Sequence, residues 1–369
     1  MTAFRYFRSP PATTSRLAAL SLAALSVAAG AGLPSRPMIE IRSGNTLLEG
    51  TVLASDGSRV EFLARDGRLW DLAAGSLAGS RPLPMSFRSA SATEVRAALE
   101  RELDGQLSVG GTSHFVVACP QGQVARWSQR FEDLLRSFRH YFAVRGLEPH
   151  EPEFPLIAVV WPSQQEFLRQ ANREGNKVGP GVLGFYSPLT NRVSLYDSAA
   201  LRGGDWGQNA SVIIHEATHQ SAFNTGLHNR FAPPPRWLAE GLGMLFEAPG
   251  VWNSERFPLA ESRVNRERLA SFRRYLSQGR KPQTWLELVG SDTMFGHAAL
   301  QAYAESWAFT FFLTETEPAK YNSLLKRVAA KADFAPYPAT ARLADFKAIF
   351  GDNFPMLEAN FLRFVATIR

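Results

Sequence analysis

The chain has 369 residues, of which 45% are hydrophobic and 11% aromatic, so it can bury a large core and is not a disordered protein. Its formal net charge is +6, but residues 1–31 contain three arginines and no acid, and without them the charge is +3. Such a small excess, without dense basic blocks between aromatic residues, gives no support for nucleic-acid binding.

The first 31 residues have the layout of a secretory signal peptide. Three arginines precede the apolar run Leu17–Ala29, which is followed by the small residues Gly30 and Ala31. The run has 13 residues, fewer than the roughly 20 that a helix needs to cross a bilayer. No later segment is long and apolar enough to span. We therefore expect an exported protein, periplasmic or extracellular, without a membrane span in the mature chain; an uncleaved signal anchor is the alternative.

Residues 38–80 are predicted to form a small antiparallel β module of the SH3-like kind. Short alternating runs predict four strands, and Asp56-Gly57 and Asp66-Gly67 supply tight turns between them. The four runs are Met38–Ile41, Gly50–Leu53, Val60–Leu63 and Arg68–Leu72. The module contains no catalytic constellation, and its partner is unknown. Residues 81–112 are expected to be a linker with a short helix.

Residues 113–369 are predicted to form an α+β domain with a small mixed sheet followed by a mainly helical second half. Aromatic residues and leucines recur every three or four positions from Trp127 to Phe142, which predicts a long helix. Strands are expected at Leu156–Trp161, Val182–Tyr186 and Arg192–Tyr196. Cys119 is the only cysteine, so an intramolecular disulfide and a thiolate zinc cluster are excluded. It ends an apolar run that is typical of a buried strand.

The pattern H-E-x-x-H lies in a helical stretch that Gly226 is well placed to end. Residues four apart on a helix leave the same face, so His215 and His219 can hold one ion. Glu216 is rotated about 100° from His215 and flanks the ligands without coordinating. It is therefore the candidate general base for a zinc-bound water, whose pKa the ion lowers toward neutrality.

A second motif follows in residues 233–247, where three prolines precede a predicted helix and Glu240 lies in a mostly apolar stretch. The short connection between the two segments favours antiparallel neighbouring helices. Glu240 can then complete a two-histidine, one-carboxylate site for one Zn²⁺, with an open fourth position. The alternative is a helix with two histidines and no metal, but the apolar run Val212–Ile214 indicates a buried helix, where such polar residues are costly without a partner.

The two motifs together resemble those of the gluzincin zinc metallopeptidases: H-E-x-x-H, then a glutamate 21 residues after the second histidine, within W-L-x-E-G. The form W-L-A-E-G-L, preceded by Pro-Arg, is most similar to the bacterial DUF1570 domain group. The resemblance covers roughly residues 113–330. It implies a gluzincin-like fold, zinc ligation by His215, His219 and Glu240, Glu216 as the base, and a peptide or protein substrate.

The resemblance also implies a downstream tyrosine or histidine that stabilises the oxyanion. Tyr303 is the candidate and His297 its competitor; for Tyr303, packing against Trp307 one turn away is the alternative role. In relatives the strand before the metal helix pairs with an extended peptide. Here this strand would be Arg192–Tyr196, although an ordinary sheet edge is equally compatible.

One position departs from the family pattern. Many gluzincins carry an acid four residues after the glutamate ligand to orient a histidine, but here that position is Met244. Either a backbone carbonyl or Glu247 substitutes for it, or the site is weaker. The sequence therefore predicts an exported zinc-dependent peptidase. The alternative is a non-catalytic binding or scaffolding protein with the same fold, which Met244 favours and the intact Glu216 opposes, because a structural site needs no base.

Overall fold

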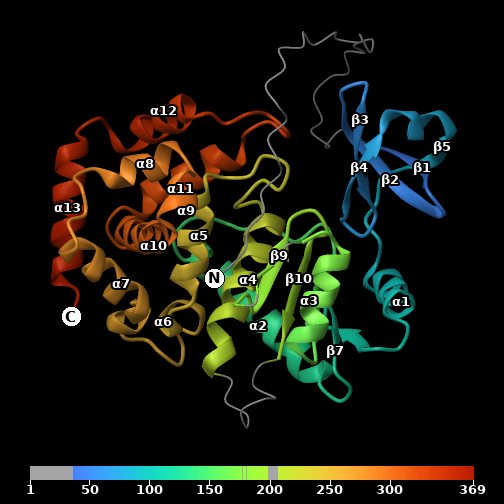
Figure 1. Ribbon diagram of the computed structural model, residues 1–369, viewed down its shortest axis with the longest axis horizontal. Coiled ribbons are helices and arrows are strands. Elements are labelled where there is room, and N and C mark those ends of the chain that lie inside the picture. Colours follow the sequence, from blue (N-terminus) through green and yellow to red (C-terminus); the bar gives the residue numbers. More distant parts are fainter. Residues whose placement is uncertain (1–35, 177, 180, 198–206) are drawn as a thin grey trace. The chain divides into compact units, whose positions relative to one another are not determined.

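The structure is a computed structural model that describes residues 36–176, 178–179, 181–197 and 207–369 (Figure 1). Contacts divide the described chain into two compact units, one ending at Ser89 and the other running from Ala90 to Arg369. The predicted signal peptide, residues 1–31, lies outside the described residues. Every helix within the described ranges is too short or too polar to cross a membrane.

The N-terminal unit is a five-stranded antiparallel sheet in the order β4-β3-β2-β1-β5. Its elements are β1 (Pro37–Ser43), β2 (Thr46–Ser55), β3 (Arg59–Ala64), β4 (Leu69–Ala73), the 3₁₀ turn η1 (Ala74–Gly79) and β5 (Arg81–Ser86). Gly57 and Gly67 have φ angles of +85° and +86°, a conformation that glycine adopts without strain. The predicted antiparallel module, with its first four strands, is confirmed.

The fifth strand, β5, lies in the range that the sequence analysis assigned to a linker. It pairs with β1, and Pro82 stands opposite Ile39. Proline has no backbone N–H to donate, so Pro82 and Pro84 are tolerated because β5 is an edge strand. The same prolines made this segment resemble a linker. The rest of that range contributes α1 (Ala92–Leu103) and β6 (Ser108–Gly111) to the second unit.

The second unit begins with a mixed sheet in the order β6-β7-β8-β10-β9. Its further strands are β7 (Phe115–Cys119), β8 (Leu156–Trp161), β9 (Gly184–Ser187) and β10 (Arg192–Tyr196). β8 runs parallel to β7 and β10, whereas β6 and β9 are antiparallel to their neighbours. The expectation that Arg192–Tyr196 borders the cleft as a sheet edge is wrong, because β10 pairs on both sides and β9 is the edge strand.

Helices cover both faces of this sheet, and alternate residues of β7 point to opposite faces. Val116 and Ala118 pack with α1 and α3 (Gln164–Arg173) on one face. On the other, Phe115 stacks on Phe131 of α2 (Val124–Ala143), with the ring centroids 5.4 Å apart. α4 (Gly207–Asn224) packs against α2 and contacts β9 and β10.

Cys119 ends β7 and is buried, as the apolar run before it predicted. Burial raises the pKa of its thiol to about 11, so little of the reactive thiolate forms near neutral pH. This agrees with a structural place for Cys119 in the core.

Helices form the rest of the unit, coloured yellow to red in Figure 1. They are α5 (Arg236–Phe246), α6 (Pro249–Trp252), α7 (Arg266–Ser277), α8 (Thr284–Gly290), α9 (Met294–His297), α10 (Ala299–Thr316), α11 (Pro318–Ala329), α12 (Ala339–Phe350) and α13 (Phe354–Thr367), with the 3₁₀ turn η3 (Ala260–Arg263) between α6 and α7. Residues 302–314 of α10 are all buried, so its apolar surface is enclosed on every side. α5 packs between α4 and α10. The predicted α+β class, with a small mixed sheet and a mainly helical second half, is confirmed.

Candidate metal centre

The H-E-x-x-H pattern lies in the second half of α4. This helix ends at Asn224, and Gly226 follows with a φ of +81°, where the sequence predicted a glycine stop. His215 and His219 project from the same face of α4, and their rings meet edge to face with centroids 4.6 Å apart. Both histidines and Glu216 are buried.

Glu240 is brought to these histidines because α5 carries glycine where it meets each neighbouring helix. A Cβ atom at Gly243 would lie 2.7 Å from Cε1 of His215, a distance that would force the ring to shift. A Cβ atom at Gly241 would lie 2.8 Å from the carbonyl oxygen of Ser306 on α10. The two glycines therefore let α5 touch α4 on one side and α10 on the other.

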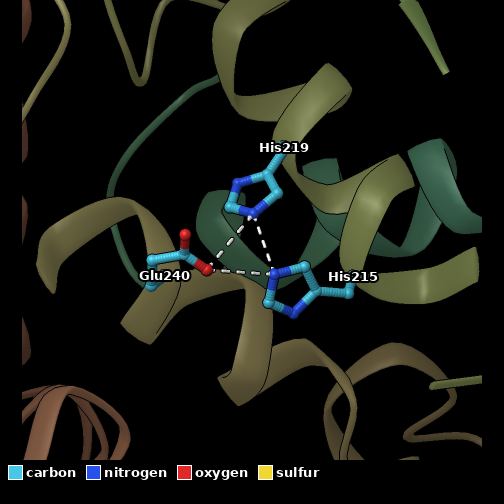
Figure 2. A group of neighbouring side chains, drawn as sticks. All are labelled: His215, His219 and Glu240. Carbon is cyan, nitrogen blue, oxygen red and sulfur yellow. Dashed lines mark hydrogen bonds and ion pairs between the residues drawn. The ribbon is translucent and has the colours of Figure 1, made fainter. Parts of the chain in front are cut away.

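The side chains of His215, His219 and Glu240 converge in Figure 2, and within the described ranges they form a group that could hold a metal ion. Nε2 of His215 lies 2.9 Å from Nε2 of His219 and 3.3 Å from Oε2 of Glu240. Nε2 of His219 is 3.9 Å from the same oxygen. A tetrahedral zinc ion at about 2.1 Å from each ligand would separate the ligands by about 3.4 Å, which lies inside this range.

The surroundings of Glu240 provide an independent test of whether a cation fits. Both carboxylate oxygens are buried, and neither has a hydrogen-bond partner in the described part of the chain. Nε of Arg236 lies 3.5 Å from Oε1, and Oε2 faces the two histidines, but none of these contacts is a hydrogen bond to the carboxylate among the described residues. A buried carboxylate without hydrogen bonds is costly, and a bound cation would compensate it. The residues therefore fit a metal ion.

His215 is oriented by Glu247, which follows the last residue of α5. Nδ1 of His215 donates to Oε1 of Glu247 at 2.9 Å, because a carboxylate can only accept. Burial acts to lower the pKa of His215, but its contacts with Glu240 and Glu247 outweigh burial and raise the pKa to about 10. With Nδ1 occupied in this way, Nε2 is the atom that faces the centre.

Glu247 is itself held as a carboxylate. Nδ2 of Asn265 donates to its Oε2 at 2.8 Å, and Nη2 of Arg268 lies 3.6 Å from its Oε1. Burial acts to raise the pKa of Glu247, but the contact with His215 and the charge of Arg268 lower it below its usual value. Glu247 thus does what an acid at position 244 does in many gluzincins, and of the two substitutes considered from the sequence it is the one that contacts His215.

His219 has the opposite protonation preference. Burial and the charge of His215 lower its pKa well below the usual value, so its imidazole is neutral, the form that binds a metal.

Glu216 contacts the edge strand of the sheet. Its Oε2 accepts a hydrogen bond from the backbone N–H of Tyr186 in β9, at 2.8 Å. Its Oε1 is buried and has no hydrogen-bond partner among the described residues. Burial raises the pKa of Glu216 to about 8, within the range in which a carboxylate can exchange protons near neutral pH.

Tyr303 lies on α10, next to the start of α5. Its hydroxyl oxygen accepts a hydrogen bond from Nη2 of Arg236 at 3.0 Å. Burial raises the pKa of Tyr303, and the negative charges of Glu240 and Glu216 raise it further, which places the phenol within the field of the candidate centre. The ring also packs edge to face against Phe295, with centroids 5.2 Å apart.

His297, the competitor of Tyr303, is in a different environment. Its side chain is 63% exposed, and its Nε2 lies 3.8 Å from a carboxylate oxygen of Glu287. It belongs to the short helix α9, outside the group formed by the two histidines and Glu240.

Two residues at the centre were given no role from the sequence. Arg236 stands four residues before Glu240, so the spacing of ion pairs on a helix could have suggested it. Tyr186 acts through its backbone N–H, which carries no side-chain signal, so no pattern in the sequence could have identified it.

Comparisons with known proteins gave a family match and a distant structural similarity. Residues 209–335, which contain both motifs and Tyr303, match a family described as a protein of unknown function (DUF1570). No curated protein sequence matches the chain. Among solved structures, the chain is similar to yeast LTA4 hydrolase in complex with bestatin, with 14% identity and a TM-score of 0.41. That similarity covers 69% of this chain, which spans only 37% of the yeast enzyme, and the activity of that enzyme does not carry over at this level.

Proposed function

We propose that this protein is an exported zinc-dependent hydrolase that cleaves peptide bonds. The observation that carries the proposal is the buried group of His215, His219 and Glu240, in which the Glu240 carboxylate has no hydrogen-bond partner among the described residues. Glu216 lies next to His215 in the same helix and is not part of this group. Peptide bonds as the substrate class rest on the resemblance of the two motifs to gluzincins. The signal-like residues 1–31 support export.

Glu216 is the proposed general base. Zinc, when bound, would supply the positive charge that acidifies a water molecule and polarises the substrate carbonyl. The N–H of Tyr186 holds Oε2 of Glu216, which leaves Oε1 to accept the proton and to return it to the leaving amine. A purely structural metal site would have no use for such a carboxylate.

Tyr303 is the proposed donor to the oxyanion of the tetrahedral intermediate. It is buried, and it is hydrogen-bonded to Arg236, whose Nε lies 3.5 Å from Oε1 of the ligand Glu240. These contacts favour Tyr303 over the exposed His297. A positioned donor of this kind is typically worth 10²–10³-fold in kcat, on the order of 3 kcal/mol.

The substrate backbone is proposed to run along β9 rather than β10. Because the N–H of Tyr186 reaches Glu216, the backbone at Tyr186 is directed away from β10 and toward the metal helix. An extended peptide alongside β9 would have its carbonyl groups close to Glu216, which already occupies the N–H of Tyr186, and this placement would depend little on the peptide's side chains.

A non-catalytic role is the second candidate, and Met244 was the reason to consider it. The contact between His215 and Glu247 weakens that reason, because the orienting acid is present at another position. The proposal of catalysis is therefore favoured.

The deciding experiment combines metal analysis of the purified mature protein with hydrolysis of a mixed peptide library. We expect one zinc per chain, cleavage by the wild type, and a loss of about 10²–10⁴-fold in Glu216→Gln with zinc retained. Glu255→Gln, at an exposed position, is the matched control and should cleave normally. Absence of bound zinc would refute the centre, whereas zinc without cleavage would favour the non-catalytic role.

Export is tested separately by expression of the full chain in a bacterial host. We expect the protein outside the cytoplasm, with an N-terminus close to residue 32 by sequencing. An unprocessed chain in the membrane fraction would instead identify an uncleaved signal anchor.

A further inference from the structure

Arg236 contacts both the metal ligand Glu240 and the proposed oxyanion donor Tyr303, and it has no role of its own in the proposed reaction. It is the first residue of α5, one turn before Glu240. Its Nη2 donates to the hydroxyl oxygen of Tyr303 at 3.0 Å, and its Nε lies 3.5 Å from Oε1 of Glu240. A single guanidinium thus lies between a metal ligand and the phenol proposed to donate to the oxyanion.

The position of Arg236 is fixed from several directions. Its backbone N–H donates to Oδ1 of Asp292 at 2.9 Å, and Asp292 is held by two hydrogen bonds from Arg342 at 3.0 and 3.2 Å. Its guanidinium carbon lies 4.5 Å from the ring centroid of Phe295, which also packs against Tyr303. The planar group is therefore set in place before any substrate binds.

The hydrogen-bonding chemistry of the guanidinium determines which way the phenol donates. A guanidinium has only donors, so the oxygen of Tyr303 must accept from Arg236, and the hydroxyl hydrogen must point elsewhere. At the same time Nε of Arg236 lies 3.5 Å from Oε1 of Glu240, so the guanidinium stands between the phenol and this buried carboxylate.

We propose that Arg236 is a positioning residue that directs the hydroxyl hydrogen of Tyr303 away from Glu240 and toward the substrate oxyanion. The inference rests on the proposed function and names how one residue of that site is controlled. Without Arg236, the phenol is free to donate to Glu240, which removes it from the oxyanion and withdraws charge from a metal ligand.

The test is a double-mutant cycle on the zinc-loaded full chain, with Arg236→Met, Tyr303→Phe and the double variant. Each is assayed for kcat and KM on a peptide that the wild type cleaves, and for zinc content. We expect Tyr303→Phe to lower kcat about 10²-fold, and Arg236→Met to lower it at least about tenfold, with KM within about threefold and one zinc per chain. In the Tyr303→Phe background, Arg236→Met should cost less than about threefold, because the phenol through which it acts is gone.

Two further variants separate positioning from general damage. Arg236→Lys keeps the positive charge and an ammonium that can donate to the phenol, and it should recover part of the kcat lost in Arg236→Met. Arg256→Met is the matched control: Arg256 is exposed and also lies over a ring, Phe257, at 5.5 Å from the centroid, and its removal should leave kcat unchanged. Independent, multiplicative losses for Arg236→Met and Tyr303→Phe would overturn the inference while leaving the proposed function intact.

A second readout does not depend on turnover. An N-phosphoryl dipeptide presents a tetrahedral anion to the centre, and its dissociation constant for the zinc-loaded protein is measured by calorimetry in the same cycle. We expect Arg236→Met and Tyr303→Phe each to weaken binding at least about tenfold, without further loss in the double variant. Unchanged binding in Arg236→Met overturns the inference alone, whereas a wild-type chain that neither cleaves peptides nor binds this probe overturns the proposed function and the inference with it.

Discussion

Two buried clusters of charged side chains lie in the second unit, and they differ in how their polar atoms are satisfied. In the arginine cluster, Arg280 donates twice to Glu305 at 2.7 and 2.5 Å and once to Glu358 at 2.8 Å. The backbone N–H of Gln283 adds a bond to Glu358 at 2.7 Å. Every charge there has a partner of opposite sign, so the cluster is complete as it stands.

The metal centre, formed by His215, His219 and Glu240, has no comparable set of bonds. Two imidazole nitrogens lie 2.9 Å apart, and the carboxylate of Glu240 has no hydrogen-bond partner among the described residues. Burial is as complete as in the arginine cluster. Arg236 lies 3.5 Å from Glu240 but makes no hydrogen bond to it. The difference indicates that the arginine cluster stabilises the fold directly, whereas a bound cation would complete the contacts of the metal centre.

Breaking the arginine cluster should have the largest effect on stability. Arg280→Met leaves two buried carboxylates without their cation, which typically costs about 3–5 kcal/mol. We expect this loss in urea unfolding of both the metal-free and the zinc-loaded protein, with Arg274→Met, an exposed arginine on α7, as the control. A loss seen only in the zinc-loaded protein would contradict the assignment of a metal-independent role.

Breaking the metal centre should give the reverse pattern. Glu240→Gln keeps the shape of the ligand and removes its charge, so we expect it to abolish the stabilisation by zinc, about 4 kcal/mol at a zinc concentration 1,000 times the dissociation constant. In the metal-free protein it should cost less than half of what Arg280→Met costs, because Glu240 has no hydrogen-bond partner in the described part of the chain and its ion pair with Arg236 is long, at 3.5 Å. An equally large loss without zinc would mean that Glu240 is a structural residue.

The sequence predicted the metal centre better than the arginine cluster, for a physical reason. The spacing of His215 and His219 fixes their common face on any helix, and the short connection to α5 predicted the approach of Glu240. Arg280, Glu305 and Glu358 come from segments far apart in the chain, and no local pattern brings them together. The same limit applies to the contact between Arg236 and Tyr303, which joins α5 to α10.

In the mixed sheet, too, the local sequence predicted the strands but not which strands lie side by side. Residues of β8 and β10 were predicted correctly from their apolar runs. Their order was not, because the hairpin of β9 and β10 places its second strand beside β8. The order of strands depends on which strands pair with each other, and the local sequence of a strand does not show its pairing partners.

His228 sharpens the comparison, since it is a buried ionisable group that forms no ion pair within the described ranges. Its Nδ1 lies 3.0 Å from the carbonyl oxygen of Leu227, and its Nε2 has no hydrogen-bond partner among the described residues. Burial lowers its pKa to about 4, so the folded protein keeps it neutral where the unfolded chain, with a pKa of 6.5, is protonated.

The stability that depends on His228 should therefore be lost as the pH falls from about 6.5 to 4. The unfolded chain binds one more proton in this interval, and the shift corresponds to about 3 kcal/mol. We expect urea unfolding of the metal-free protein to show a steeper decline in this range for the wild type than for His228→Gln. Parallel declines would mean that His228 is protonated in the folded state.

The smallest expected effect is on the affinity for zinc, through the residue that orients His215. Glu247→Gln replaces the carboxylate that accepts from Nδ1 of His215 with an amide that accepts less strongly. Loss of such a partner typically lowers metal affinity 10–100-fold, about 1.4–2.7 kcal/mol.

Competition with a chelator of known affinity measures this change, and Glu255→Gln serves again as the exposed control. Glu247→Asp is the informative companion: it keeps the charge but shortens the side chain, so an intermediate affinity is expected if the hydrogen bond to Nδ1 matters. If Glu247→Gln binds zinc as tightly as the wild type, then the charge at position 247 does not orient His215, and the absence of an acid at Met244 again favours a non-catalytic protein. If affinity falls as expected, the metal centre resembles the arginine cluster in one respect. The hydrogen bonds from His215 and Asn265 to Glu247 are already formed, and the centre lacks only a metal ion, which must come from solution.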